Sequence, residues 1–222
     1  MRNTINIILS VVFAISIVIL TITVSIGLPI YVRPFYYAHV DALDMPEDWG
    51  LPREYIIEAY DEVLDFLTLE GREFGSGVLP FSEAGKGHFE DCKVLFDLNR
   101  DALIISLILV VALFVLHKLK LIKLAKPFGF SLSFFSGVGT LVLFAALGII
   151  VAQDFSEAFR IFHTIFFPGK DNWMFDPYED PIILFMPQEF FMNCAILICA
   201  SILVISAALI VVGIIRKRRN RA

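Results

Sequence analysis

The 222-residue sequence lacks the short motifs of several common enzyme classes. It contains no P-loop, no glycine-rich dinucleotide fingerprint, no G-x-S-x-G elbow and no H-E-x-x-H helix. These absences argue against ATPases, common dehydrogenases, ordinary serine lipases and zincin proteases. Cysteine is also scarce. Cys194 and Cys199 lie in an apolar run and only Cys92 lies in polar sequence, which argues against a disulfide framework.

Apolar residues, in contrast, are in excess. They make up 58% of the chain, with a mean hydropathy of +0.77, whereas soluble domains contain about 45–50%. Four runs come close to the ~20 residues that cross a bilayer. The predicted fold is therefore an all-α integral membrane protein, a single membrane domain over residues 1–222. Its four transmembrane helices are expected at residues 5–28, 97–117, 131–152 and 192–215.

Charge is strongly segregated between the segments that join these runs. Basic residues collect in loop 118–130 and after the fourth run, so the positive-inside rule places both, and both termini, in the cytoplasm. Residues 29–99 carry fifteen Asp and Glu against five Lys and Arg, and residues 153–191 carry seven against two. We therefore expect loops 29–96 and 153–191 to form a small, mainly helical extracytoplasmic cap. Acidic outer loops also argue against a nucleic-acid partner.

Each acidic loop is predicted to contain a helix. The first should run from Pro52 to Leu69, with apolar residues at helical spacing on a packed face: Ile56, Tyr60, Leu64 and Leu67. The second should begin at a capping box led by Asp154, carry His163 and end before Pro168. Its many phenylalanines favour a place in the headgroup region. After Gly87 the chain can be helical directly into the second span.

The residues best suited to chemistry are histidines in these two loops. His88 lies one helical turn from Asp91, and His163 precedes Trp173 and Asp176. Histidine titrates near neutrality, so two of them can divide general base and general acid between them. A carboxylate one turn away can hold an imidazole in one tautomer.

Other interpretations of the same residues remain open. The histidines can be interfacial residues that bind loop backbone, or His88, Asp91 and His163 can form a metal site, one ligand short of a closed tetrahedral set. Cys92 as a nucleophile has no neighbouring base except His88. Ser82 lacks an elbow and fits a cap or turn.

Five motifs, in order and with the four-span pattern, resemble the lipoprotein intramolecular transacylase (Lit) family of Gram-positive bacteria. They are Leu79–Glu83, His88–Asp91, Phe162–Phe167, Asn172–Phe175 and Asp180–Ile183. The resemblance covers essentially the whole chain. Ala84–Gly87 departs from it, because a more helical, charged segment is expected there.

The resemblance implies an acyltransferase that acts on a diacylated bacterial lipoprotein. The sn-2 acyl chain of the diacylglyceryl group passes to the α-amine of the same N-terminal cysteine, which gives the N-acyl, S-monoacylglyceryl (lyso) form. His88 and His163 match the family's functional pair. We expect Asp91 to orient His88, Trp173 and Phe166 to wall the pocket, and three further residues to support the site: Ser82, Glu83 and Asp176.

The resemblance further implies a monomer in the cell membrane that contacts membrane lipid and uses no cofactor and no metal. Its active site should lie at the extracytoplasmic face. Two alternatives stand beside it: a non-enzymatic assembly factor or sensor that uses its acidic loops, and a metal-dependent lipid hydrolase.

Overall fold

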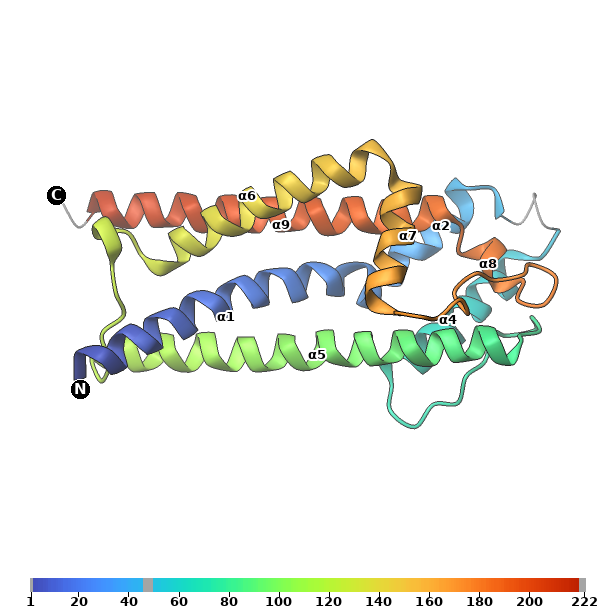
Figure 1. The fold of residues 1–222 in the computed structure, drawn as a ribbon, viewed down its shortest axis with the longest axis horizontal. Coiled ribbons are helices and arrows are strands. Elements are labelled where there is room, and N and C mark those ends of the chain that lie inside the picture. Colours follow the sequence, from blue (N-terminus) through green and yellow to red (C-terminus); the bar gives the residue numbers. More distant parts are fainter. Residues whose placement is uncertain (1, 46–49, 220–222) are drawn as a thin grey trace. The chain divides into compact units, whose positions relative to one another are not determined.

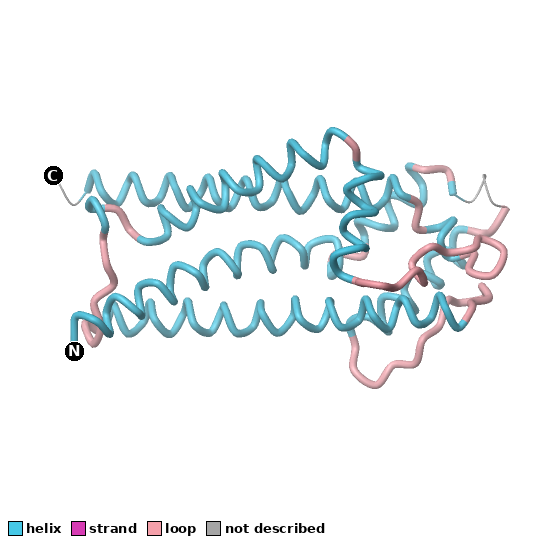
Figure 2. The backbone as a smooth tube through the Cα atoms, in the orientation of Figure 1, coloured by secondary structure: helices cyan, strands magenta, loops and turns pink. Residues whose placement is uncertain are grey.

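The computed structural model describes residues 2–45 and 50–219. Within these ranges the regular structure is entirely helical and no strand is present (Figure 2). Contacts divide the chain into two compact units, which are described separately. The bundle unit contains Met1–Ile26, Arg100–Ile150 and Leu197–Ala222. The loop unit contains Gly27–Asn99 and Val151–Ile196.

Four helices are long and apolar enough to cross a membrane: α1 (Arg2–Tyr31), α5 (Glu83–Lys118), α6 (Leu132–Gln153) and α9 (Gln188–Arg219). They confirm the predicted all-α architecture with four spans. With 36 residues, α5 is roughly 54 Å long, whereas the hydrocarbon core is about 30 Å thick. The membrane-spanning part of α5 is therefore its charge-free stretch after Asp101. The turns before Asp101, which carry His88, lie outside that stretch.

Close helix packing in the bundle unit depends on glycine. A Cβ at Gly137 of α6 would lie 2.9 Å from the Ser206 carbonyl oxygen of α9, and one at Gly213 of α9 would lie 2.7 Å from Phe134 Cβ. Small residues of this kind let helices approach closely in lipid, and α6 lies along α9 in Figure 1. Both ends of the described chain lie at the end of the bundle that holds the α5–α6 connection (Figure 1). The side of the membrane on which they lie stays a prediction.

The loop unit is built around an aromatic core. Helix α2 (Pro34–Ala42) packs on α4 (Arg53–Thr68) through Tyr36 and Tyr60, whose rings stack 3.6 Å apart. The Tyr36 hydroxyl donates to the carbonyl of Phe185, at the end of α8 (Ile182–Phe185). The predicted apolar face of α4 is confirmed, because its four residues are all buried: Ile56, Tyr60, Leu64 and Leu67.

Helix α7 (Phe155–Phe166) forms as its sequence predicts. Asp154 Oδ1 accepts from the Glu157 backbone N–H at 2.9 Å, which satisfies one of the free donors of the first turn. The helix ends two residues before Pro168, which cannot continue it. A C-cap at Phe167 turns the chain into the segment that holds Trp173.

Helix α5 begins at Glu83, earlier than the predicted start after Gly87. Ser82 caps it: its Oγ accepts from the Gly85 N–H at 2.9 Å, while its own N–H and Oγ donate to Asp180 at 2.8 and 2.7 Å. A Cβ at Gly85 would lie 2.2 Å from Asp180 Oδ1. Glycine at this position therefore makes room for the carboxylate and does not break the helix.

Candidate active site

The loop unit brings the two predicted histidines together. His88 comes from the second turn of α5 and His163 from the last turns of α7, and their ring centroids lie 5.7 Å apart with an interplanar angle of 32°. Both are buried, at 5% and 6% exposed. One reacting atom of a substrate can reach both rings at this separation.

The tautomer of His163 follows from its surroundings. Its Nδ1 lies 2.7 Å from the Phe159 carbonyl oxygen, and since a carbonyl only accepts, Nδ1 carries the proton. Nε2 of the neutral ring then holds a lone pair. Burial lowers the pKa of His163 below its usual value, which keeps the ring neutral at pH 7. Trp173 stacks on it with centroids 4.5 Å apart.

His88 is held at one nitrogen and free at the other. Its Nε2 lies 3.4 Å from Cys92 Sγ, whereas its buried Nδ1 has no hydrogen-bond partner in the described part of the chain. Burial raises the pKa of Cys92 to about 12, so the residue is a thiol that can donate to Nε2. When the thiol donates to Nε2, Nδ1 carries the proton of the neutral ring. An unpaired N–H in a buried site is suited to a substrate oxygen.

Burial also controls the charge of His88. It lowers the pKa of His88 to about 4; His163 and Lys170 add to this effect and Asp91 opposes it. The site at neutral pH therefore contains two uncharged imidazoles, with a lone pair on one and an N–H on the other.

Aromatic side chains surround the pair. Phe167 lies 5.0 Å from the His88 ring and 5.7 Å from the His163 ring, and Phe175 lies 5.5 Å from His88. The prediction for Phe166 is wrong: this side chain is 49% exposed and packs on Phe162. The reason is the helix C-cap, where the chain direction changes and turns Phe167 inward.

Asp91 does not orient His88, contrary to expectation. Its carboxylate accepts from Lys170 Nζ at 2.5 Å and from Asn172 Nδ2 at 3.2 Å. Asp91 therefore fixes the segment after α7 against α5, and so places Trp173. The described residues include no group of three or more His, Cys, Asp or Glu side chains that could hold a metal ion.

The three supporting residues lie away from the histidine pair. Ser82 is a helix cap, as its context predicts. Glu83 is 90% exposed and faces Lys86 at 3.9 Å, and Asp176 is exposed and accepts from the Tyr178 N–H. Sequence reasoning missed three residues: Phe167, Phe175 and the buried Asp180. For Asp180 the available signal was its place in an Asp-Pro motif of the family.

The low pKa of His88 predicts a loss of stability in acid. The folded value of about 4 lies below the ~6.5 of an unfolded histidine, so between these values the unfolded chain binds more protons and stability falls as pH falls. Between pH 6.5 and 5 this one group should cost about 1.5 kcal/mol. When the pH is lowered from 6.5 to 5, the melting temperature in detergent should therefore fall further for the wild type than for His88→Gln. His39→Gln is the matched control and should follow the wild type, and parallel curves for all three proteins would contradict a buried neutral His88.

The chain is similar to proteins of one known family. The family model described as lipoprotein intramolecular transacylase Lit matches residues 11–191. The structure of Lit from Bacillus cereus is similar at 25% identity and a TM-score of 0.88, over 99% of each chain. Two variants of that protein, with one histidine replaced by arginine or by alanine, are similar at 24% identity and a TM-score of 0.80. They cover 99% of this chain, and 95% and 97% of their own. No curated protein matched by sequence.

The family model extends over most of the chain, and the similar structures are of a membrane-integral transacylase. Family and fold agree with the four spans, which makes the protein a multi-pass membrane acyltransferase. The chain belongs to the lipoprotein intramolecular transacylase (Lit) family.

Proposed function

We propose that the enzyme moves the sn-2 acyl chain of a diacylglyceryl-cysteine to the α-amine of that same N-terminal cysteine. The product is the N-acyl, S-monoacylglyceryl form of a lipoprotein. One observation carries the proposal: the rings of two buried histidines lie 5.7 Å apart between centroids, and Nδ1 of His88 has no hydrogen-bond partner among the described residues. Donor ester and acceptor amine sit on one molecule, so holding them together replaces a collision between two reactants.

The neutral state of the pair favours unequal roles. An imidazole with a pKa of about 4 is not protonated at pH 7, so His88 has no extra proton to deliver. Its Nδ1–H is instead suited to donate a hydrogen bond to the ester carbonyl oxygen, where negative charge develops. His163, with Nε2 free, is suited to carry the proton. This division replaces the simpler expectation of one histidine as base and the other as acid.

The proton balance closes with these two residues. An α-amine has a pKa near 7.7–8.0, so part of it is neutral at pH 7. The neutral amine attacks the ester carbon, the C–N bond forms, and the amine proton passes to His163 Nε2. The C–O bond then breaks and the glyceryl oxygen takes that proton from His163. Both histidines return to their starting state and no acyl-enzyme is formed.

The exposed face of α7 supports a substrate at membrane-headgroup depth. Ile165 and Phe166 are 66% and 49% exposed, and an amphipathic helix of this kind lies in the interface with its apolar face toward lipid. The ester of a membrane-anchored lipoprotein is found at the same depth. We further propose that the active site lies at the extracytoplasmic face and that the enzyme works as a monomer without a cofactor.

The reaction itself can be tested with purified protein in vesicles and a synthetic diacylglyceryl lipopeptide. Tandem mass spectrometry should find one chain as an amide on the cysteine nitrogen and a free glyceryl hydroxyl, with and without EDTA. Release of free fatty acid, or loss of the reaction on chelation, would favour a metal-dependent lipid hydrolase instead.

Replacing Cys92 should leave the reaction largely intact. The thiol contacts His88 but its raised pKa makes it a poor nucleophile, so Cys92→Ala should keep lyso-form production within about tenfold of the wild type. The small loss reflects a less well-held His88 ring. Cys194→Ala is the control, and intact-protein mass spectrometry should find no acyl adduct. An acyl mass on the wild type that Cys92→Ala removes would establish a thioester route and overturn direct transfer.

A further inference from the structure

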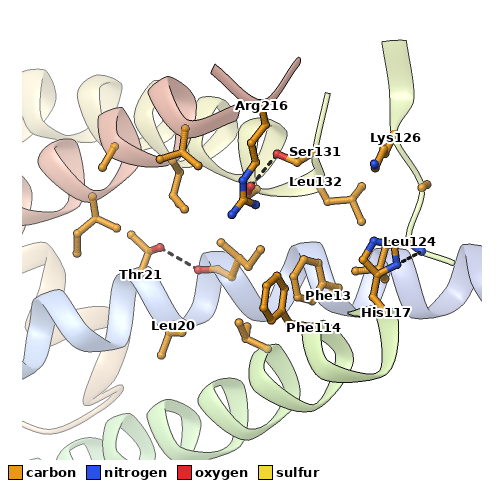
Figure 3. A pocket seen from close by; sticks show the side chains of 18 of the residues that line it. Phe13, Leu20, Thr21, Phe114, His117, Leu124, Lys126, Ser131, Leu132 and Arg216 are labelled. Atoms are coloured by element: carbon orange, nitrogen blue, oxygen red, sulfur yellow. Dashed lines mark hydrogen bonds between the residues drawn. The ribbon is translucent and has the colours of Figure 1, made fainter. Parts of the chain in front are cut away.

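The bundle unit contains a cavity that the proposed reaction does not use. Its volume is about 1140 Å³, larger than the ~300–1,000 Å³ of most small-ligand pockets. Four helices line it with apolar side chains (Figure 3): Phe13 and Leu20 of α1, Phe114 of α5, Leu132 of α6 and Leu209 of α9. The cavity is thus large and apolar enough to take a hydrocarbon chain.

Cations line one end of this cavity. They are Lys118, Lys126, Arg216, Lys217 and Arg219. No Asp or Glu is among the lining residues, and within residues 2–45 and 50–219 none of the five cations forms an ion pair. Figure 3 shows Arg216 reaching from its helix into the cavity, toward α1 and Phe13. Arg216 is exposed and no carboxylate is among the described residues that line the cavity, so its guanidinium is open to an anion that enters there.

The α5–α6 connection holds this charged end in place. The backbone N–H of Lys123 donates to Asn6 Oδ1 and that of Ala125 to Ser10 Oγ, both side chains of α1. The Leu124 N–H faces His117 Nδ1 at 3.4 Å (Figure 3). These bonds fix the backbone just before Lys126, so the point from which this side chain extends is set before any ligand arrives.

We propose that this cavity binds an anionic phospholipid, with one acyl chain among the helices and the phosphate between Arg216 and Lys126. Basic pockets between transmembrane helices recognise anionic head groups in this way. A soluble phosphate would leave the apolar cavity unfilled, and a zwitterionic lipid would bring no net charge to five cations that lack a carboxylate partner in the described ranges of the chain. Two of these cations, Lys118 and Lys217, lie over the rings of Phe114 and Phe130. The site is independent of the histidine pair, which lies in the other unit.

Native mass spectrometry with added phosphatidylglycerol or phosphatidylcholine tests the proposal. The wild type should retain one phosphatidylglycerol and bind phosphatidylcholine more weakly. Each juxtamembrane charge contributes about fivefold in affinity, so Arg216→Gln with Lys126→Gln should weaken phosphatidylglycerol binding roughly 30-fold. Ala208→Phe, which puts a ring into the cavity from α9, should weaken binding of the single lipid.

Two matched controls make the result decisive. Lys123→Gln removes the same charge from the same exposed connection, and Ala207→Phe adds the same ring to the next position of α9; neither residue lines the cavity. Both should bind phosphatidylglycerol like the wild type. Equal retention of the two lipids, or binding that Ala208→Phe leaves unchanged, would mean general lipid around the helices and would overturn the site.

Discussion

Replacing His163 by alanine is expected to lower the rate of lyso-form production by about 10²–10⁴-fold, the usual contribution of a general acid–base group. The Nδ1–carbonyl bond to Phe159 leaves Nε2 of His163 with the lone pair that can take the amine proton. Glutamine should not restore activity, because an amide cannot carry the proton. The rate is measured by mass spectrometry of a lipopeptide incubated with vesicle-reconstituted enzyme.

Variants of His88 should behave differently from those of His163, because His88 donates a hydrogen bond and does not carry the proton. Loss of its hydrogen-bond donor in His88→Ala should cost about 10²–10³-fold, whereas His88→Asn, which keeps an N–H, should recover part of that loss. His39→Ala is the control, since His39 bonds Phe35 outside the site. Recovery by His163→Gln but not by His88→Asn would reverse the assigned roles, and full activity of both alanine variants would end the two-histidine mechanism.

Replacing Asp180 by alanine is expected to destabilise the loop unit by about 3–6 kcal/mol. The buried carboxylate accepts from the N–H and the hydroxyl of Ser82 at 2.8 and 2.7 Å, and hydrogen bonds to a charged group contribute about 1.5–3 kcal/mol each. It also lies at the N-terminus of α5, where the helix dipole favours a negative charge. Without it, the first turn of α5 loses its anchor one turn before His88.

Denaturant titration in mixed micelles measures this loss, with Asp176→Ala as the control in the same segment. Asp176 is exposed and its side chain accepts from the Tyr178 N–H of a turn, so its replacement should change the free energy of unfolding by less than about 1 kcal/mol. Lyso-form production by Asp180→Ala should fall more than tenfold because His88 is no longer held. Equal stability of the two variants would show that Ser82 caps α5 without help from Asp180.

The sequence predicts the elements of this protein better than the contacts between them. Hydropathy predicts four spans because a bilayer demands long apolar helices, and Asp154 predicts the start of α7 because capping is local. The start of α5 is missed because it depends on a contact with a residue far away in the sequence. From the sequence, Gly85 looks like a residue that ends a helix. In the structure it makes room for the carboxylate of Asp180, nearly one hundred residues away.

For the site, too, the sequence predicts the residues better than their contacts. His88, His163 and Trp173 are found from motifs and do lie together. Asp91 is misassigned because a one-turn spacing allows contact with His88 but cannot reveal that Lys170 and Asn172 compete for the carboxylate. Phe166 and Phe167 cannot be told apart without knowing the residue at which α7 ends.

An isotope-crossover measurement tests the central claim, direct transfer within one substrate molecule, most directly. A lipopeptide with a deuterated sn-2 chain is mixed with an unlabelled lipopeptide of different peptide mass, and the products of the reconstituted enzyme are sequenced by tandem mass spectrometry. The account predicts that every deuterated chain stays on its own peptide, as an amide on the cysteine nitrogen. Deuterated chains on the unlabelled peptide, or deuterated free fatty acid as the main product, would contradict it.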